Sequence, residues 1–199
     1  MARCKICRGK FEPRYFLQKA CFDPACLAEW AKNDRETKAD VEFKARKKSF
    51  NLSDTKKQHE LTQKVYNKKR VLQEKKWFTD KGLEPECISC AKKNIDWCCG
   101  HFKSRGAQSN LRYDDMNTYL QCNRYCNMGL SGNIEGNKTT RGYKQGLVDR
   151  FGNDRAQEII EYCETNTAVR KFTGPELVQM RKEFNLQIKE FSDVQSKWV

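Results

Sequence analysis

Four short motifs between Cys87 and Asn133 decide how this chain folds: CISC at 87–90, GHF at 100–102, CNRYCN at 122–127 and SGN at 131–133. Two close cysteine pairs bracket a stretch that contains His101, one of two histidines in the chain. Pairs of thiolates at such spacings are typical of a structural zinc site. The stretch therefore predicts a loop fold held together by a metal, with one imidazole fixed inside it.

The remaining cysteines extend this pattern to a second cluster. Eight of the eleven cysteines fall into four close pairs, and paired spacings in a reducing compartment indicate metal sites rather than disulfides. We predict two structural zinc sites, each closed by four thiolates. Gly9 follows the first pair, as a tight zinc knuckle favours. The predicted ligands are Cys4, Cys7, Cys21 and Cys26 in one site and Cys87, Cys90, Cys122 and Cys126 in the other, where Cys98 and Cys99 are competing candidates.

The overall charge indicates a polyanionic partner. The chain has 39 Lys and Arg residues against 26 Asp and Glu, a formal net charge of +13. Such an excess favours phosphate neutralisation and counterion release, with an acidic membrane surface as the rival partner. Neither an apolar run of 18 residues nor an apolar N-terminal segment is present, so we expect no membrane span and no signal peptide. We expect a cytoplasmic protein that associates with the nucleoid.

The distribution of cysteines and charges predicts an α+β fold of small zinc-stabilised modules, joined and followed by α-helices. With 38% hydrophobic and 33% charged residues, one large core is not expected. The predicted segments are an N-terminal zinc finger at 1–30, a basic helical arm at 31–82, a zinc-containing core at 83–152 and C-terminal helices at 153–199. A finger this short depends on its metal for stability.

The basic segment has two open interpretations. Between residues 35 and 77 there are 14 Lys and Arg against 6 Asp and Glu, with a weak helix break at 51–54. The segment is either a solvated linker helix or an arm that contacts DNA phosphates. His59 is expected to be exposed on it. The predicted DNA contacts are Lys44, Arg46, Lys47, Lys48, Lys68, Lys69, Arg70, Lys103 and Arg105.

Capping signals predict the C-terminal helices. One helix is expected over 143–151, ended by Gly152, and a second over 154–163 with Asn153 as its N-cap. The sequence TGPE at 173–176 resembles a capping box. It opens a helix with an apolar stripe over 177–191, which either packs on the core or forms a dimer seam; residues 61–72 are the other candidate seam.

Three polar residues supply a possible chemistry. His101 follows an expected strand at 95–99, Asn117 lies in a polar loop, and Asn127 directly follows Cys126. This order resembles that of the HNH, or ββα-metal, nucleases, whose core has a treble-clef arrangement. In that chemistry the histidine takes a proton from water, the loop asparagine fixes the imidazole tautomer, and the helix residue helps to hold one divalent cation. The alternative is that His101 only packs or adds a fifth zinc ligand.

A wider set of motifs strengthens this interpretation. The series CISC…GHF…LRYDDMN…QC…CN…SGN, the N-terminal cysteine cluster and the 143–152 tail resemble the NinG (Rap) family of lambdoid phage recombination proteins over nearly the whole chain. The resemblance implies a structure-specific endonuclease that cuts branched DNA, such as Holliday junctions and D-loops, in the cytoplasm of the host cell. By position, the resemblance carries over to His101, Asn117, Asn127 and, without a defined role, Asn133.

This chain also departs from the family pattern. A three-residue spacing separates Cys122 from Cys126 where the family has two. Some members carry an acidic residue just before the GH histidine, where this chain has Cys98 and Cys99; Asp96 is the nearest acid. The ligands of a catalytic metal are therefore not fixed by the resemblance.

The sequence thus predicts a metal-dependent endonuclease with His101 as general base, Mg²⁺ or Mn²⁺ as catalytic ion, two structural Zn²⁺ ions and branched double-stranded DNA as substrate. A junction is nearly two-fold symmetric, which favours a homodimer. The alternative from another class is a non-catalytic zinc-finger protein that binds nucleic acid.

Overall fold

The computed structural model describes residues 1–128 and 134–195, so Asn133 lies outside the described residues. The chain forms two compact units, Met1–Ser53 and Asp54–Val199. Its α+β composition agrees with the prediction. The domain boundaries differ, because the segment expected to be one basic arm is divided between the two units.

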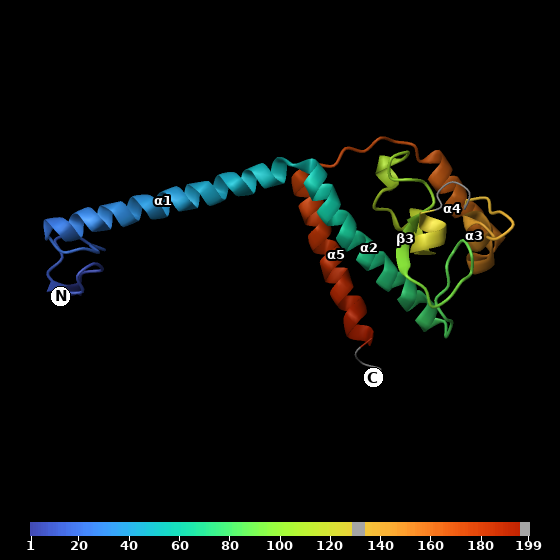
Figure 1. Ribbon diagram of the computed structural model, residues 1–199, viewed down its shortest axis with the longest axis horizontal. Coiled ribbons are helices and arrows are strands. Elements are labelled where there is room, and N and C mark those ends of the chain that lie inside the picture. The colour runs from blue at the N-terminus through green and yellow to red at the C-terminus, as the bar shows by residue number, and fades with distance from the viewer. Residues whose placement is uncertain (129–133, 196–199) are drawn as a thin grey trace. The chain divides into compact units, whose positions relative to one another are not determined.

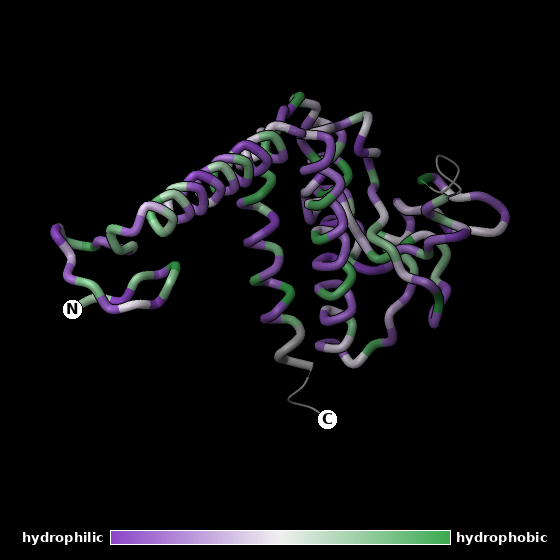
Figure 2. The backbone as a smooth tube through the Cα atoms, turned by 60° about the vertical axis from the view of Figure 1, so that its left-hand side comes forward, coloured by the Kyte–Doolittle hydropathy of each residue, from purple (hydrophilic) through white to green (hydrophobic). Residues whose placement is uncertain are grey.

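The first unit is a small finger that continues into a long helix (Figure 1). Strands β1 (Ala2–Arg3) and β2 (Lys10–Phe11) pair antiparallel, and helix α1 spans Pro24–Ser53. The carboxylate of Asp23 caps α1 by accepting hydrogen bonds from the backbone N–H groups of Ala25 and Cys26. Cys26 is the buried residue of α1, so most of this helix is solvated. Figure 2 shows hydrophilic and hydrophobic residues interspersed along it.

The second unit begins with helix α2 (Thr55–Asp80), whose N-cap Asp54 accepts from the backbone N–H of Lys57. The predicted break at 51–54 is thereby confirmed. One face of α2 is buried, and helix α5 (Gly174–Gln195) packs alongside it (Figure 1). The hydroxyl of Thr62 donates to the carbonyl of Leu177 at 3.0 Å, and the rings of Tyr66 and Phe184 are 5.3 Å apart.

These contacts assign the apolar stripe of 177–191. Leu177, Phe184 and Ile188 are all buried against the chain's own core. The two candidate seams, 177–191 and 61–72, thus pack largely against each other within the chain, which favours the core-packing interpretation of the 177–191 stripe. The capping box is confirmed, since the backbone N–H of Thr173 donates to Glu176 at 2.7 Å and the backbone N–H of Glu176 donates to the Thr173 hydroxyl at 3.4 Å.

An antiparallel hairpin forms the centre of the second unit. Strand β3 spans Trp97–His101, two residues later than predicted, and β4 spans Thr118–Cys122. Trp97 pairs with Cys122 at one end, and His101 pairs with Thr118 at the other. Residues two apart on a strand share a face, so His101 lies on the same face as Cys99, which contacts Tyr66 of α2.

Short helical turns and two helices complete the unit. The turns are η1 (Ser109–Leu111), η2 (Asp115–Asn117) and the π-helical η3 (Asn123–Asn127). Helix α3 (Tyr143–Phe151) ends at Gly152 as predicted, and α4 spans Asn153–Thr165. Gly152 has a φ of 81° and also precedes α4, so Asn153 is the first helical residue rather than the N-cap.

Helices α3 and α4 pack on the hairpin through a buried cluster that includes Ile88, Tyr119, Tyr143, Leu147 and Ile159. A Cβ atom on Gly146 would lie 1.7 Å from the carbonyl oxygen of Ile88, so α3 approaches the second cysteine knuckle as closely as backbone allows. None of the helices in the described ranges is long and apolar enough to cross a membrane.

Candidate zinc centres and the His101 site

The two CxxC motifs fold into the same knuckle. The backbone N–H of Arg8 donates to the carbonyl of Cys4 at 3.0 Å, and that of Ala91 donates to the carbonyl of Cys87 at 2.9 Å. Arg8 and Ala91 both have left-handed φ angles, 60° and 57°. Gly9 follows at once and its carbonyl accepts from the backbone N–H of Cys4 at 2.9 Å, so it takes part in the knuckle although Arg8 has the left-handed conformation.

Each knuckle is joined by the predicted second pair. The sulfurs of Cys4, Cys7, Cys21 and Cys26, and those of Cys87, Cys90, Cys122 and Cys126, lie within 4.8 Å of one another in each group. A tetrahedral site with Zn–S bonds of about 2.3 Å has S···S edges of about 3.8 Å. The Cys7–Cys21 and Cys90–Cys122 sulfurs, both 3.9 Å apart, match that edge.

Backbone groups also suit thiolates at these positions. N–H groups approach the sulfurs of Cys4, Cys87 and Cys122 at 3.3–3.4 Å. Burial raises the pKa of Cys87 to about 11, so a bound cation is what would stabilise a thiolate there. Both groups thus fit Zn²⁺, which would brace the fold without an open coordination position.

The competing cysteines are placed elsewhere. The Cys98 thiol donates to the carbonyl of Gln121 at 3.3 Å, and Cys99 is buried beside Tyr66. Burial raises the pKa of both thiols to about 12. They are packing residues, as is Cys163, which is buried in the cluster under α3 and α4.

The best-defined hydrogen bond of His101 joins its ring to a backbone carbonyl, and the backbone of Cys99 also interacts with the ring. Its Nε2 atom lies 3.1 Å from the backbone carbonyl oxygen of Arg112. A carbonyl can only accept, so Nε2 carries the proton and Nδ1 is left as the basic atom of the neutral ring. Burial lowers the pKa of His101 to about 4, so the imidazole is neutral near pH 7.

Two guanidinium groups act electrostatically on this imidazole. The positive charges of Arg105 and Arg112 lower the pKa of His101 further, after the effect of burial. The Arg112 Nε atom donates to the amide oxygen of Gln63 on α2 at 2.9 Å, which fixes the loop that supplies the carbonyl. Within the described residues, no carboxylate forms an ion pair with Arg105 or Arg112. Sequence reasoning selected Arg105 but missed Arg112, for which no motif signal existed.

Asn117 has a different role from the predicted one. It is fully buried, and its Oδ1 accepts from the backbone N–H of Lys103 at 2.7 Å. Its Nδ2 donates to the carbonyls of Lys103 and Leu111, both at 3.0 Å. The asparagine therefore holds the chain just after His101 rather than the imidazole itself.

Asn127 and Asp96 belong to the other end of the hairpin. Asn127 ends η3, which begins after Cys122, and Asp96 precedes Trp97. At about 3.3 Å per residue, the strand places that end roughly 13 Å from His101. No hydrogen bond joins His101, Asn117 and Asn127 to one another in the part of the chain that the structure describes. The same part holds no third cluster of metal-ligating side chains.

Two of the predicted DNA contacts are structural. Lys69 and Arg70 are each 3% exposed. Lys69 contacts Asp115 at 2.5 Å, and Arg70 contacts Glu74 at 3.1 Å and donates to the carbonyl of Thr118. Their positive charges are therefore neutralised inside the fold, and the prediction for both residues is wrong.

Other predicted basic residues do face solvent. Lys44, Arg46, Lys47 and Lys48 are exposed on α1, and Lys68 and Arg105 are exposed in the second unit. Lys103 is half-buried and lies 3.4 Å from Glu164. His59, expected to be exposed, is half-buried with its Nδ1 2.9 Å from the Tyr113 hydroxyl.

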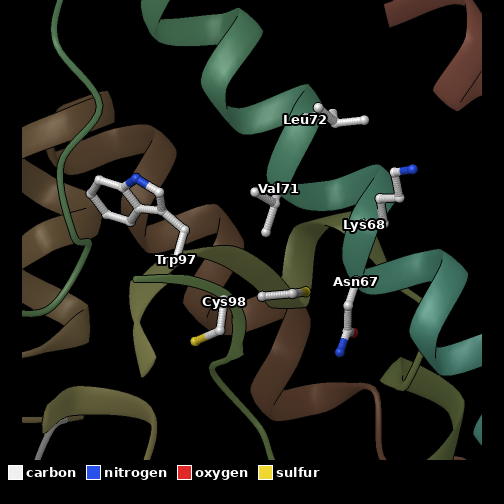
Figure 3. Close-up of a pocket in the computed structure, with 7 residues that line it drawn as sticks. Asn67, Lys68, Val71, Leu72, Trp97 and Cys98 are labelled. Carbon is white, nitrogen blue, oxygen red and sulfur yellow. The ribbon is translucent and has the colours of Figure 1, made fainter. Parts of the chain in front are cut away.

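The solvent face of α2 carries a lysine stripe that the sequence reading did not isolate. At 100° per residue, Lys57, Lys64, Lys68 and Lys75 share one direction, opposite the buried Tyr66. Beside it, a groove of about 340 Å³ lies between α2 and β3. Figure 3 shows Lys68 and Asn67 on one side of this groove and Trp97 and Cys98 on the other.

One protein family covers nearly the whole chain. The family model described as Bacteriophage Lambda NinG protein matches residues 1–193. The chain belongs to the NinG family. Protein ninG of Escherichia phage lambda is 28% identical over 112 residues, and that of Salmonella phage P22 is 29% identical over 112 residues.

The alignment with these NinG relatives covers only part of each chain. The aligned stretch is 56% of this chain and 50% of each relative, so the chain matches about half the length of the curated relatives. No solved structure matches the chain significantly.

Proposed function

We propose that this NinG-family protein is an endonuclease of phage recombination that hydrolyses phosphodiester bonds in branched DNA. The observation that supports the proposal is a neutral imidazole, His101, held in one tautomer by the Arg112 carbonyl and influenced by the positive charges of Arg105 and Arg112. Two cations without carboxylate partners attract a phosphodiester, and a neutral imidazole is the form that accepts a proton.

The proposed step uses the geometry of the ring. Nδ1 of His101 takes a proton from water while the water oxygen bonds to phosphorus, and the bond from phosphorus to the leaving oxygen breaks. Nε2 remains bonded to the Arg112 carbonyl, which stabilises the imidazolium that forms. The guanidinium groups offset the charge that develops on the phosphate oxygens. The departing oxygen takes its proton from solvent.

A divalent cation, Mg²⁺ or Mn²⁺, is part of the proposal as a requirement for activity. The described residues near His101 do not form a carboxylate cluster that fits a resident ion, since Asp114 and Asp115 are engaged with Tyr162 and Lys69. Mg²⁺ often binds through one or two protein groups plus substrate phosphates. We therefore expect the ion to bind together with DNA.

DNA contacts in the proposal follow the exposed basic residues. The lysine stripe of α2 extends about 27 Å from Lys57 to Lys75 at 1.5 Å per residue, which is about eight base pairs of duplex. The exposed basic residues of α1 at 44–48 would add phosphate contacts. We expect the protein to act in the cytoplasm, associated with the nucleoid. A homodimer would place two sites on one junction. A monomeric mass in light scattering of the junction complex would contradict the homodimer.

A non-catalytic zinc-finger binder is the second candidate, and one observation favours it. Asn127, the residue expected to help hold the catalytic ion, lies at the opposite end of the hairpin from His101. A binder needs only the basic surfaces and the two zinc sites. It predicts a stable complex with junction DNA and no strand cleavage under any divalent cation.

Cleavage of a four-way junction separates the two candidates. Wild-type protein, His101→Gln and His59→Gln would be incubated with labelled junction and linear duplex, with and without Mg²⁺ or Mn²⁺. We expect cleavage near the branch, a loss of at least about 10²-fold in His101→Gln, and near-normal cleavage in His59→Gln. Zinc content and junction binding should be unchanged in His101→Gln. Undiminished cleavage by His101→Gln would refute the proposal.

A further inference from the structure

The N-terminal finger presents three consecutive large side chains to solvent. Tyr15 is 64% exposed, Phe16 89% and Leu17 65%, and we call these three residues the apolar tip. They lie in the connection between the first knuckle and Cys21, so the first zinc site closes the chain on both sides of them. Exposed apolar side chains are common singly, but three large ones in a row on a short loop are typical of a contact surface.

The apolar tip is held in a fixed conformation. Gln18 is 6% exposed, and its Oε1 accepts from the backbone N–H of Arg14 at 2.9 Å while its Nε2 donates to the carbonyl of Ala20 at 2.8 Å. The Gln18 N–H donates to the carbonyl of Tyr15 at 3.3 Å. Leu17 has a φ of 66°, a backbone conformation that residues other than glycine rarely adopt. The loop thus projects the tip outward rather than folding it onto the finger.

Basic side chains surround the finger that carries the tip. Its first 23 residues contain six basic residues and two acidic ones, and the basic residues are all exposed. One of the acids, Asp23, is occupied in capping α1. The Arg14 guanidinium lies 4.2 Å from the centre of the Phe22 ring, beside the tip. No carboxylate pairs with these basic groups among the described residues.

We propose that the apolar tip is a wedge that packs against exposed base faces at the branch of a DNA substrate, with the basic residues on the flanking phosphates. In nucleic acids the negative charge lies on the phosphates, and the apolar surface is the faces of the bases. A continuous duplex covers those faces by stacking, whereas a branch interrupts stacking. Apolar wedges and aromatic side chains use such sites in DNA-binding proteins. The inference rests on the proposed branched substrate and gives the finger the task of recognising the branch.

Binding without divalent cations tests the wedge independently of cleavage. Affinities of the full chain for a four-way junction and for linear duplex would be measured for wild type, Phe16→Ala and the matched control Phe43→Ala. Phe43 is 60% exposed on α1 of the same unit. We expect Phe16→Ala to weaken junction binding roughly tenfold and duplex binding less than twofold, and Phe43→Ala to leave the ratio unchanged. Zinc content confirms that each variant is folded.

A fluorescent base reports the contact directly. A 2-aminopurine at the branch should change its emission when wild type binds, and this change should be absent with Phe16→Ala at saturating protein. A junction-to-duplex ratio that is equal in Phe16→Ala and Phe43→Ala would overturn the proposal. The proposal would also be overturned if Phe16→Ala changed only the sedimentation mass of the protein, or only its binding to anionic phosphatidylserine vesicles, and not its junction binding. Loss of cleavage activity in all proteins, with selectivity intact, would count against the nuclease and not the wedge.

Discussion

Asn117 binds both backbone polar groups of Lys103, accepting from its N–H at 2.7 Å and donating to its carbonyl at 3.0 Å. This pair of hydrogen bonds fixes the chain two residues after His101. Asn117 also donates to the carbonyl of Leu111, so one buried amide holds the start, the middle and the end of the loop between β3 and β4 together. In the candidate site this asparagine is a positioning residue for the loop.

Replacing Asn117 should therefore affect stability before chemistry. Asn117→Ala leaves the backbone groups of Lys103 and Leu111 without partners inside the fold, which we expect to lower the free energy of unfolding by about 2–4 kcal/mol. Asn127→Ala, at a half-exposed position, should change it by less than about 0.5 kcal/mol. Urea denaturation of both variants measures the difference. Equal stability of Asn117→Ala and wild type would contradict the assigned role.

The protonation of His101 gives a second prediction. Because its pKa is lowered to about 4 from an ordinary value of 6.5, protonation disfavours the folded state. The contribution of His101 to stability is complete above pH 6.5 and is lost as the pH falls toward 4. Between pH 7 and pH 5, wild type should lose about 2 kcal/mol more than His101→Gln.

Nitrogen NMR of the imidazoles measures the same property directly. The chain has two histidines, so His59→Gln assigns the spectrum. The His101 ring should show a protonated Nε2 and a bare Nδ1 at pH 7, with a titration midpoint near 4. A midpoint at 6.5 or a protonated Nδ1 would rule out the arrangement described for Arg112.

The lysines of α2 should separate into two classes. Lys64→Ala with Lys68→Ala should reduce the slope of log K against log salt by about 1.8, since each phosphate contact contributes about 0.9. Lys69→Ala should instead destabilise the fold by about 1.5–3 kcal/mol, because it removes a charged hydrogen bond to Asp115, whose side chain is 42% exposed and still lies 3.7 Å from Arg70. Filter binding at several salt concentrations and urea denaturation distinguish the classes. A normal salt slope in the double variant would exclude the stripe from the DNA surface.

The two zinc sites should fail independently. Cys7→Ser should remove one of two zinc ions and unfold the finger, while the second unit keeps its structure, because each site lies within its own unit. Cys90→Ser should remove the other ion and, with it, the hairpin that holds His101. Metal analysis combined with amide exchange of each unit shows which site is lost. Loss of both ions from either single variant would contradict independent sites.

The sequence allowed the zinc ligands to be predicted because thiolate pairing is local and its spacing is visible. The same holds for the capping box at 173–176 and for the helix break before Asp54. The burial of Lys69 and Arg70 could not be predicted, because it depends on Glu74 and Asp115, which come together only when α2 packs on the hairpin. Arg112 was missed for a related reason: its backbone carbonyl, which any residue has, is the group that orients His101.

The second knuckle and the first residues of η3 lie at the two ends of the segment that contains His101, Arg105, Arg112 and Asn117. A single ion would therefore cross-link the two ends of this segment and close it into a loop. The length of chain between Cys90 and Cys122 is then constrained, because each added or deleted residue must be absorbed inside the closed loop. Insertions before Cys87 or after Cys126 are not subject to that constraint, so differences in length among related chains should concentrate outside the metal-closed loop.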